Sequence, residues 1–277
     1  GTTWQVQYLG NISGNNNGCL GDVGEGFTGF TTSDTLYFEA RAGVQGSATS
    51  TGSELWGYNI VNQTAWMVND TCPGWCNGVA NTDFHWAEAN GVLYIPVRES
   101  NGIGAQSLGI FNPALPIAGT SSSGGSGSGG STATTTYGNN SWWLVDNIWP
   151  TASADPGSLM HEEIGDTLYF DAQESSYGRE LWAYDTSNQT IWRVTDIAAG
   201  ATGSQPGRDM HTVVGDTIYF DASDNIHGRE LWAHDTSNHS TWRVTDIING
   251  SSGSSPGNFM SIVVGDTIYF DADDYFD

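Results

Sequence analysis

The stretch GDTIYFDASDNIHGRELWAHDTSNHSTWRVTDI, which runs from Gly215 to Ile247, is the best guide to the architecture because the chain repeats it. Nearly the same residues stand fifty positions earlier, from Gly165 to Ile197, as GDTLYFDAQESSYGRELWAYDTSNQTIWRVTDI. A third copy begins at Gly265 as GDTIYFDADDYFD. Self-similarity at a fixed period of this length indicates an array of equivalent structural units.

Weaker copies extend the array to five units. The pattern LYF, or a variant of it, is centred on five tyrosines, namely Tyr37, Tyr94, Tyr169, Tyr219 and Tyr269. The pattern W-x-V begins at five tryptophans, namely Trp4, Trp66, Trp143, Trp192 and Trp242. The pattern ELW occurs three times, and QSLGIF at 106–111 is a degraded copy of it. The first two units are therefore expected to be less regular than the later ones.

Each unit contains four short runs that predict β-strands. In the best copy these are MHTVVG, TIYFDA, ELWAHD and TWRVTDI, which are rich in β-branched and aromatic residues and bounded by turn formers. A tight turn at Gly215-Asp216 separates the first two runs. The apolar residues of TIYF do not alternate with polar ones, which favours a strand covered on both faces. Helix signals are nearly absent.

Four antiparallel strands per unit and five units predict an all-β chain folded as a five-bladed β-propeller. A solenoid is the alternative, but its repeats are normally shorter and need atypical end caps. We expect one domain over residues 1–277. The Gly/Ser/Thr-rich residues 118–140 cannot pack a core, so we expect a flexible surface loop, natural or engineered, between the third and fourth strands of the second unit.

The chain begins and ends inside a repeat. GTTWQV at the start reads as a fourth strand, and DTIYFDADDYFD at the end reads as the first two strands of a unit. We expect the segment Trp4–Tyr8 to complete the blade that contains Ile268, because propellers commonly close by joining their termini. The missing third strand then comes from residues beyond Asp277 or from another subunit. No signal peptide is visible, so we expect that a leader was removed or not included.

The repeat resembles the ELWxxDGT family. GRELWAHDTSNHSTWRVTDI is similar to the family pattern G-x-ELW-x-x-DGT-x-x-GT-x-x-V-x-DI, which a Gly/Ser/Pro stretch and an LYF-x-A strand follow. The similarity covers Leu159–Asp271 well, the first unit partly and the second poorly. The sequence departs at DGT, which Asp185-Thr186-Ser187 and Asp235-Thr236-Ser237 replace. The resemblance implies a propeller-like fold in a large secreted or surface protein, and it implies no reaction.

The charge balance excludes several partners. The formal net charge is −24, and the chain has no lysine. All seven basic residues are arginines, namely Arg41, Arg98, Arg179, Arg193, Arg208, Arg229 and Arg243. Such a chain offers no patch that neutralises phosphates, so we expect neither a nucleic acid partner nor insertion into an anionic membrane.

Cysteines and glycosylation motifs favour an extracellular or cell-surface location. Cys72 and Cys76 in TCPGWCNG can close a small disulfide loop, which leaves Cys19 free or paired elsewhere, and no Cys/His pair nearby completes a zinc site. Seven N-x-[ST] motifs are present, at Asn11, Asn62, Asn69, Asn139, Asn188, Asn238 and Asn249. Glycans are expected to project from Asn188 and Asn238, which fall on the same turn of successive repeats.

The acidic loops after the second strand of a unit are the candidate metal sites. Oxygen ligands close to a glycine suit Ca²⁺, although none of the loops has the full D-x-[DN]-x-[DN]-G spacing. The alternative is that Asp and Asn simply favour tight hairpin turns. The candidate ligands are Asp171, Glu174, Asp221, Asp224, Asp271 and Asp273.

No catalytic residues are identified. Folding the third strand onto the fourth brings Arg179 near Asp196, and Arg229 near Asp246, which predicts structural cross-strand ion pairs. His161 and His211 occupy equivalent positions, but the next unit has Ser261 there. The zinc-protease motif H-E-x-x-H and the phosphate-binding P-loop motif are absent. We therefore expect no enzyme, although loops of different blades can assemble a site that sequence does not reveal.

Tryptophans divide into two groups. Those that follow the repeat are expected to pack between blades, namely Trp182, Trp192, Trp232 and Trp242. Those outside the pattern are candidates for stacking on sugar rings, namely Trp75, Trp86, Trp142 and Trp149.

The function expected from sequence is that of an extracellular glycoprotein with a structural or adhesive role, such as a subunit of a surface fibre, filament or layer. Its partners are expected to be other copies of itself, surface proteins or glycans. The alternative is a lectin-like carbohydrate-binding module assisted by Ca²⁺, and the weaker alternative is a propeller hydrolase.

Overall fold

The computed structural model describes residues 29–32, 34–41, 53–69, 87–89, 91–98, 106–114, 142–145, 148–149 and 152–274. Every regular element in these residues is a β-strand, and each strand pairs antiparallel with its neighbours. The prediction of an all-β chain is therefore confirmed for the described part. Within the same residues no helix is long and apolar enough to cross a membrane.

The first compact unit covers Gly1–Ser153 and contains two four-stranded antiparallel sheets. The first sheet consists of β1 (Gly29–Thr31), β2 (Thr35–Arg41), β3 (Ser53–Asn59) and β4 (Thr64–Asn69). The second sheet consists of β5 (Ala87–Ala89), β6 (Val92–Arg98), β7 (Gln106–Phe111) and β8 (Trp142–Leu144). A shared core joins them, in which the Tyr37 and Phe111 rings meet edge to face 4.9 Å apart.

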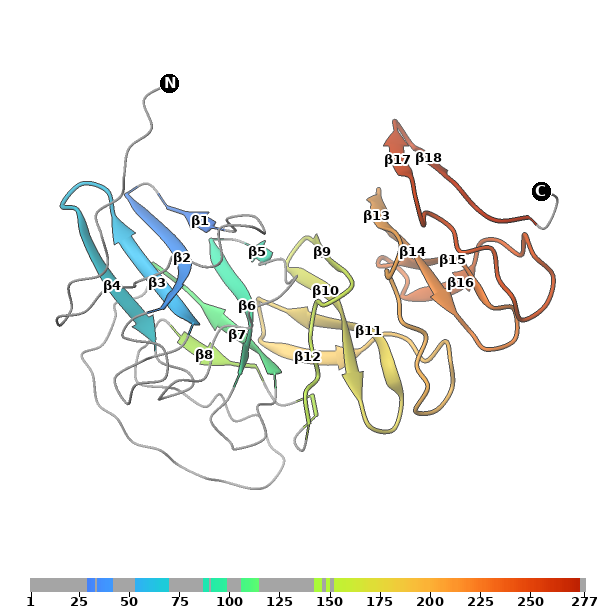
Figure 1. Cartoon of the computed structure of the whole chain (residues 1–277), viewed down its shortest axis with the longest axis horizontal. Helices are drawn as coiled ribbons and strands as arrows, with labels where there is room; N and C mark the ends of the chain where they lie inside the picture. The colour runs from blue at the N-terminus through green and yellow to red at the C-terminus, as the bar shows by residue number, and fades with distance from the viewer. Residues whose placement is uncertain are drawn as a thin grey trace. The chain divides into compact units, whose positions relative to one another are not determined.

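The second compact unit covers Ala154–Asp277 and contains the three most regular repeats (Figure 1). The third sheet consists of β9 (His161–Ile164), β10 (Thr167–Glu174), β11 (Gly178–Asp185) and β12 (Thr190–Arg193). The fourth sheet consists of β13 (His211–Val214), β14 (Thr217–Ser223), β15 (Arg229–Asp235) and β16 (Ser240–Arg243). The fifth sheet consists of β17 (Ser261–Val264) and β18 (Thr267–Phe270).

Each of the two compact units has hydrophobic clusters of its own, and the single domain expected over residues 1–277 stays a prediction. Four of the five sheets have the four strands that the repeat predicted. Several sequence predictions lie outside the described residues, namely the loop 118–140, the strand Trp4–Tyr8 and the cysteines Cys19, Cys72 and Cys76.

Glycine sets the tight turn that starts each regular sheet. Gly165, Gly215 and Gly265 all have a φ of 61°. In the fourth sheet Val214 pairs with Thr217, so Gly215 is the first residue of a two-residue loop. A positive φ at this position is what a type II′ hairpin turn requires, and glycine adopts it without a steric penalty. The Gly-Asp dipeptide of the repeat thus determines the register of the first two strands.

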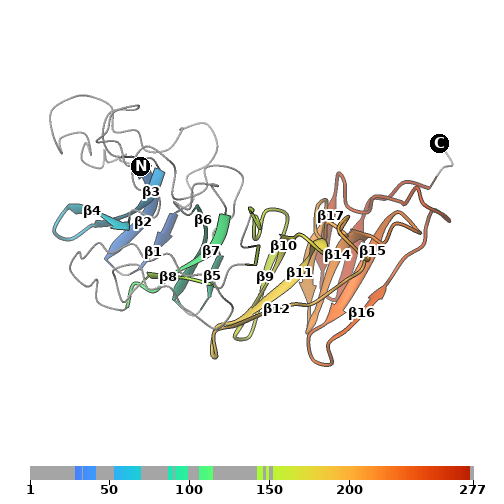
Figure 2. The same ribbon diagram turned by 90° about the horizontal axis from the view of Figure 1, so that it is seen from below.

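The third and fourth sheets lie side by side and share one core (Figures 1 and 2). Residues 168–172 of β10 are all buried, which confirms that this strand is covered on both faces. Leu181 and Ala183 of the third sheet pack in one cluster with Ile218 and Phe220 of the fourth.

A buried glutamate links each of these sheets to the next repeat. Glu180 accepts hydrogen bonds from the Thr195 hydroxyl at 2.7 Å and from the main-chain N and the hydroxyl of Ser204 at 3.0 and 2.8 Å. Glu230 receives equivalent bonds from Thr245 and Ser254. Because Ser204 and Ser254 each begin the following repeat, these carboxylates hold consecutive sheets together.

Aspartate and arginine form a second buried anchor inside each sheet. The Asp171 carboxylate accepts from the main-chain N of Leu159 and Met160 at 2.7 and 2.9 Å, and it pairs with Arg179. Asp221 makes the same contacts with Asp209, Met210 and Arg229. Both carboxyl groups are fully buried.

These contacts correct the predicted ion pairs. Arg179 pairs with Asp171 and Asp155 instead of Asp196, and Asp196 lies 3.8 Å from Arg193. Arg229 pairs with Asp221 instead of Asp246, and Asp246 lies 3.1 Å from Arg243. The physical reason is strand length. β12 ends at Arg193, which pairs with Trp182, so Arg179 lies beyond the paired part of that hairpin.

Close main-chain packing makes Gly178 harder to replace than other glycines with positive φ. A Cβ on Gly178 (φ 65°) would overlap the main chain of Gly203, whereas a Cβ on Gly215 (φ 61°) meets nothing within 4 Å. We expect Gly178→Ala to lower the free energy of unfolding by about 2 kcal/mol. The control Gly215→Ala should lower it by about 1 kcal/mol, since only the backbone strain applies. Urea denaturation of both variants checks this prediction, and equal losses would contradict it.

Candidate functional site

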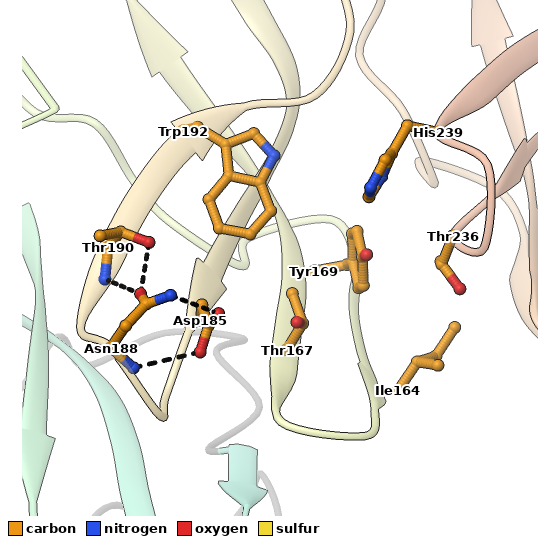
Figure 3. A pocket seen from close by; sticks show the side chains of 9 residues that line it. All are labelled: Ile164, Thr167, Tyr169, Asp185, Asn188, Thr190, Trp192, Thr236 and His239. Atoms are coloured by element: carbon orange, nitrogen blue, oxygen red, sulfur yellow. Dashed lines mark hydrogen bonds between the residues drawn. The ribbon is translucent and has the colours of Figure 1, made fainter.

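A pocket of about 490 Å³ lies between the third and fourth sheets. Its walls come from three parts of the second compact unit (Figure 3). The β9–β10 hairpin contributes Ile164, Thr167 and Tyr169, and the β15–β16 turn contributes Thr236 and His239. The β11–β12 hairpin contributes four residues, namely Asp185, Asn188, Thr190 and Trp192.

Aromatic rings form much of the pocket wall. Trp192 and His239 stand on opposite sides of the pocket, and Tyr169 lies between them (Figure 3). The Trp192 side chain is half-buried, because it also packs on the core shared by the two sheets. Tyr169 is only 3% exposed. Burial raises the pKa of the Tyr169 phenol, so this group is neutral at physiological pH.

The polar wall is a hydrogen-bonded turn. The Asp185 carboxylate accepts from the Ser187 main-chain N at 2.8 Å, from the Ser187 hydroxyl at 2.6 Å and from the Asn188 amide at 2.7 Å. Asn188 Oδ1 in turn accepts from the N and the hydroxyl of Thr190 at 3.0 and 2.5 Å. The hydrogen bond from the Ser187 hydroxyl is the main cause that lowers the pKa of Asp185. The turn therefore presents an ionised acceptor in a fixed geometry.

A neutral histidine stands behind the aromatic wall. His234 of β15 is 1% exposed, and its ring lies 5.8 Å from Tyr169 and 6.5 Å from His239. Its Nδ1 lies 2.9 Å from the Thr241 hydroxyl. Burial is the main cause that lowers the pKa of His234 to about 4, with a smaller effect from His239. The imidazole is thus uncharged at neutral pH.

The repeat carries the same surface on the fourth sheet, where no turn among the described residues covers it as the β15–β16 turn covers the pocket. Asp235, Asn238 and Trp242 occupy the positions of Asp185, Asn188 and Trp192, and Asp235 makes the same bonds to Ser237. Trp242 is 41% exposed, so the prediction that it packs in the core is wrong. Trp182, Trp192 and Trp232 are half-buried, with Trp192 and Trp232 packed on the shared core. The pocket tryptophan therefore follows the repeat, a signal that sequence analysis assigned to packing.

The predicted metal ligands have other roles in the structure. Asp171 and Asp221 face an arginine and two main-chain N–H groups, which leaves no open coordination site at these carboxylates. The Glu174 carboxylate accepts hydrogen bonds from the Ser175 hydroxyl and the Ser176 main-chain N. The Asp224 carboxylate lies 2.7 Å from Nδ1 of His227. Asp271 accepts from the main-chain N of Met260, and the main-chain N of Asp273 donates to the Ser254 carbonyl. Among the described residues no group of three or more His, Cys, Asp or Glu is placed to hold a metal ion.

The glycosylation motifs fall into four groups. Asn62, Asn188 and Asn238 are exposed and occupy the turn after the third strand of their sheets. Asn249 is exposed in the connection to the fifth sheet, and Asn69 is half-buried at the end of β4. Asn11 and Asn139 lie outside the described residues. Modification stays a prediction at every position, and a glycan on Asn188 would be attached to a residue that lines the pocket.

The remaining candidates do not join the pocket. His161 and His211 approach with ring centroids 6.5 Å apart, and His211 Nδ1 lies 2.8 Å from Glu162 Oε1. Trp149 is half-buried in the first compact unit. Trp75, Trp86 and the side chain of Trp142 lie outside what the structure describes.

No protein-family model and no curated protein matches the sequence. Among solved structures, a prolyl endopeptidase is similar with a TM-score of 0.40 and 9% identity over 76% of this chain and 24% of its own. The AtxE2 isopeptidase has a TM-score of 0.39 and 10% identity over 78% and 32%. A puromycin hydrolase has a TM-score of 0.33 and 14% identity over 68% and 23%. The chain thus spans between 23% and 32% of the length of these structures.

These comparisons contradict the prediction that the chain is not an enzyme, since the named structures are an endopeptidase, an isopeptidase and a hydrolase. We do not retain that prediction. At TM-scores of 0.40 and below, the likeness assigns neither a reaction nor a closed propeller to this chain. The resemblance to the ELWxxDGT repeats stays a prediction.

Proposed function

We propose that the chain is a binding module for neutral or amino-substituted saccharides. The observation that carries the proposal is the half-buried Trp192 ring, which faces a pocket bounded by the Asp185, Asn188 and Thr190 turn. A sugar ring has an apolar face of C–H groups and an edge of hydroxyl groups. An indole face suits the first, and fixed carboxylate, amide and hydroxyl groups suit the second.

The charge of the chain narrows the class of saccharide. The formal net charge is −24, and Asp185 is ionised at the edge of the pocket. A like charge on the ligand would be repelled by both, so sulfated and carboxylated sugars are disfavoured. The affinity for neutral sugars is not reduced by the negative charge, and the affinity for positively charged amino sugars is increased by it.

The same proposal includes a fold and a location. Five successive antiparallel sheets, four of them four-stranded, support a five-bladed β-propeller in which each sheet is one blade. Binding of surface glycans accords with the extracellular or cell-surface location and the adhesive role inferred from the sequence.

A glycan array followed by calorimetry tests the proposal. We expect the full chain, with Asn188 verified as unmodified by mass, to bind neutral or amino sugars and to retain this binding in a chelator. Trp192→Ala should weaken binding at least about tenfold, because the stacking face is lost. The matched control Trp242→Ala removes the equivalent residue outside the pocket and should change affinity by less than about twofold.

Two results would overturn this function. One is an array on which the full chain binds no saccharide. The other is a bound saccharide whose affinity is the same for the wild-type chain and for Trp192→Ala.

A further inference from the structure

One proline of the repeat follows an aspartate, and this is the only Asp-Pro dipeptide in the sequence. Three prolines stand at equivalent positions of the last three repeats, namely Pro156, Pro206 and Pro256. The residues before them differ and are Asp155, Gln205 and Ser255. An aspartate carboxylate can attack its own main-chain carbonyl carbon through a five-membered ring, which is an intramolecular reaction with a high effective concentration. The dipeptide at residues 155–156 is therefore a candidate site of self-cleavage.

The backbone at this dipeptide is strained. Asp155 has a φ of 41°, in the left-handed region that costs free energy in residues other than glycine. The strain is increased because a residue before a proline favours an extended backbone. Two hydrogen bonds to β10 hold the strained conformation. Gln173 N donates to the Ala154 carbonyl at 2.8 Å, on one side of the dipeptide. Gly157 N donates to the Asp171 carbonyl at 2.7 Å, on the other side. Breaking the bond to the proline releases this strain.

One guanidinium contacts both of the groups that would react. Arg179 Nη1 donates to the main-chain carbonyl oxygen of Asp155 at 3.0 Å, and Arg179 Nη2 lies 3.5 Å from the carboxylate oxygen Oδ2 of the same aspartate. The first contact polarises the carbonyl, and it stabilises the negative charge that develops on this oxygen when the carbon is attacked. The Asp155 side chain is 33% exposed, so water can reach the site.

The fourth sheet repeats this arrangement without the carboxylate. Arg229 donates to the Gln205 carbonyl at 3.0 Å, and Gln205 has a positive φ of 50°. The arginine and the strained backbone therefore belong to the repeat itself. The reactive group that the third sheet adds is the carboxylate of Asp155, so the next repeat supplies the matched control residue.

We propose that the chain cleaves its own peptide bond between Asp155 and Pro156. The Asp155 carboxylate forms a C–O bond to its main-chain carbonyl carbon, and Arg179 stabilises the oxyanion of the tetrahedral intermediate. The C–N bond then breaks as the Pro156 nitrogen takes a proton from the solvent, which leaves a cyclic anhydride at Asp155. Water opens the anhydride and returns protons to the solvent, so the net reaction is hydrolysis by one water molecule.

Cleavage at this bond has a structural consequence. The second compact unit begins at Ala154, so the reaction leaves all but the first two residues of that unit on a separate chain. This inference is independent of the saccharide pocket.

A time course of cleavage tests the proposal. The full chain is incubated at the lowest pH at which its circular dichroism is that of the folded protein, and samples are analysed by denaturing gel electrophoresis and mass spectrometry. We expect one fragment that ends at Asp155 and one that begins at Pro156. The same chain unfolded in urea at the same pH should be cleaved there at least about tenfold more slowly, because the guanidinium contacts and the strain are lost. This comparison separates self-cleavage in the fold from the general acid lability of Asp-Pro bonds.

Four variants, each verified as folded by circular dichroism, assign the roles. Asp155→Gln introduces the residue of the next repeat and should yield no fragments. Asp155→Glu keeps the negative charge but needs a six-membered ring, so its cleavage should be at least about tenfold slower. Arg179→Lys keeps the positive charge but loses the planar pair of donors, and its cleavage should also be at least about tenfold slower. The exposed control Asp216→Gln should be cleaved within about twofold of the wild-type rate.

Three results would overturn the proposal. They are an intact bond between Asp155 and Pro156 in the folded chain, equal cleavage rates in the folded and the urea-unfolded chain, and cleavage of Asp155→Gln at the wild-type rate. Cleavage of Arg179→Lys at the wild-type rate would overturn the assigned role of Arg179. Asp155→Glu leaves Arg179 in place, so it tests the site even if Arg179→Lys does not fold.

Discussion

Replacing Arg179 by leucine is expected to lower the free energy of unfolding of the second compact unit by about 3–5 kcal/mol. The guanidinium pairs with the fully buried Asp171 carboxylate and also donates to the Asp155 carbonyl at 3.0 Å and to the Ser158 hydroxyl at 2.5 Å. Removing it leaves a buried charge with two main-chain donors and the Ser158 hydroxyl, and no cation, as partners. Urea denaturation followed by circular dichroism measures the loss.

Two further variants separate this ion pair from a general effect of losing an arginine. Arg208 is exposed and lies 3.9 Å from Asp209, so Arg208→Leu should change stability by less than about 1 kcal/mol. Adding Asp171→Asn to Arg179→Leu removes the buried charge and should restore more than about 1 kcal/mol. The account fails if Arg208→Leu is as destabilising as Arg179→Leu, or if the second substitution restores nothing.

The pH dependence of this loss has a definite sign. Burial raises the pKa of Asp171, and Arg179 opposes that shift. In the Arg179→Leu variant the pKa of Asp171 in the folded chain rises further above its value in the unfolded chain. The variant therefore loses least stability relative to wild type at a pH below the unfolded-state pKa, where Asp171 is protonated in both states. The difference between wild type and Arg179→Leu should therefore grow as pH rises from about 4 to 7.

Acidification to pH 4 is expected to remove about 3 kcal/mol of stability through His234 alone. Its pKa is about 4 in the folded chain, below the value of 6.5 that is ordinary for a histidine. Because the folded-state pKa is the lower one, this contribution is fully present above pH 6.5. It is lost as pH falls from 6.5 to about 4, because over this range His234 binds a proton in the unfolded chain before it does so in the folded chain.

The repeat itself supplies the matched variant. The equivalent of His234 in the third sheet is Tyr184, which is also buried. His234→Tyr removes the titrating group, so wild type should lose about 3 kcal/mol more than the variant between pH 7.5 and 4. Denaturation curves at several pH values measure this difference, since all other groups titrate in both proteins. If the free energy of unfolding of the two proteins falls equally over that range, the pKa of His234 is the same in the folded and the unfolded chain, and the prediction is wrong.

Local structure was readable from the sequence because it depends on neighbours in the chain. The Gly-Asp turn and the β-branched and aromatic runs predicted the hairpins of the last three repeats, and the strands β13 to β15 begin within two residues of the expected positions. The fourth strand, β16, is shorter than expected, ending at Arg243. The prediction that such strands are covered on both faces is confirmed for β10, whose apolar run does not alternate with polar residues.

The all-β class, the repeat period and the turns could be read from the sequence, because they follow from residue patterns along the chain. Which side chains meet depends instead on how the strands and sheets pack. Arg179 pairs with Asp171 because β12 is too short to reach it. Trp192 and His239 line one pocket because two sheets stack with their turns on the same side. Such contacts depend on register and on packing between repeats, which a repeat pattern leaves open.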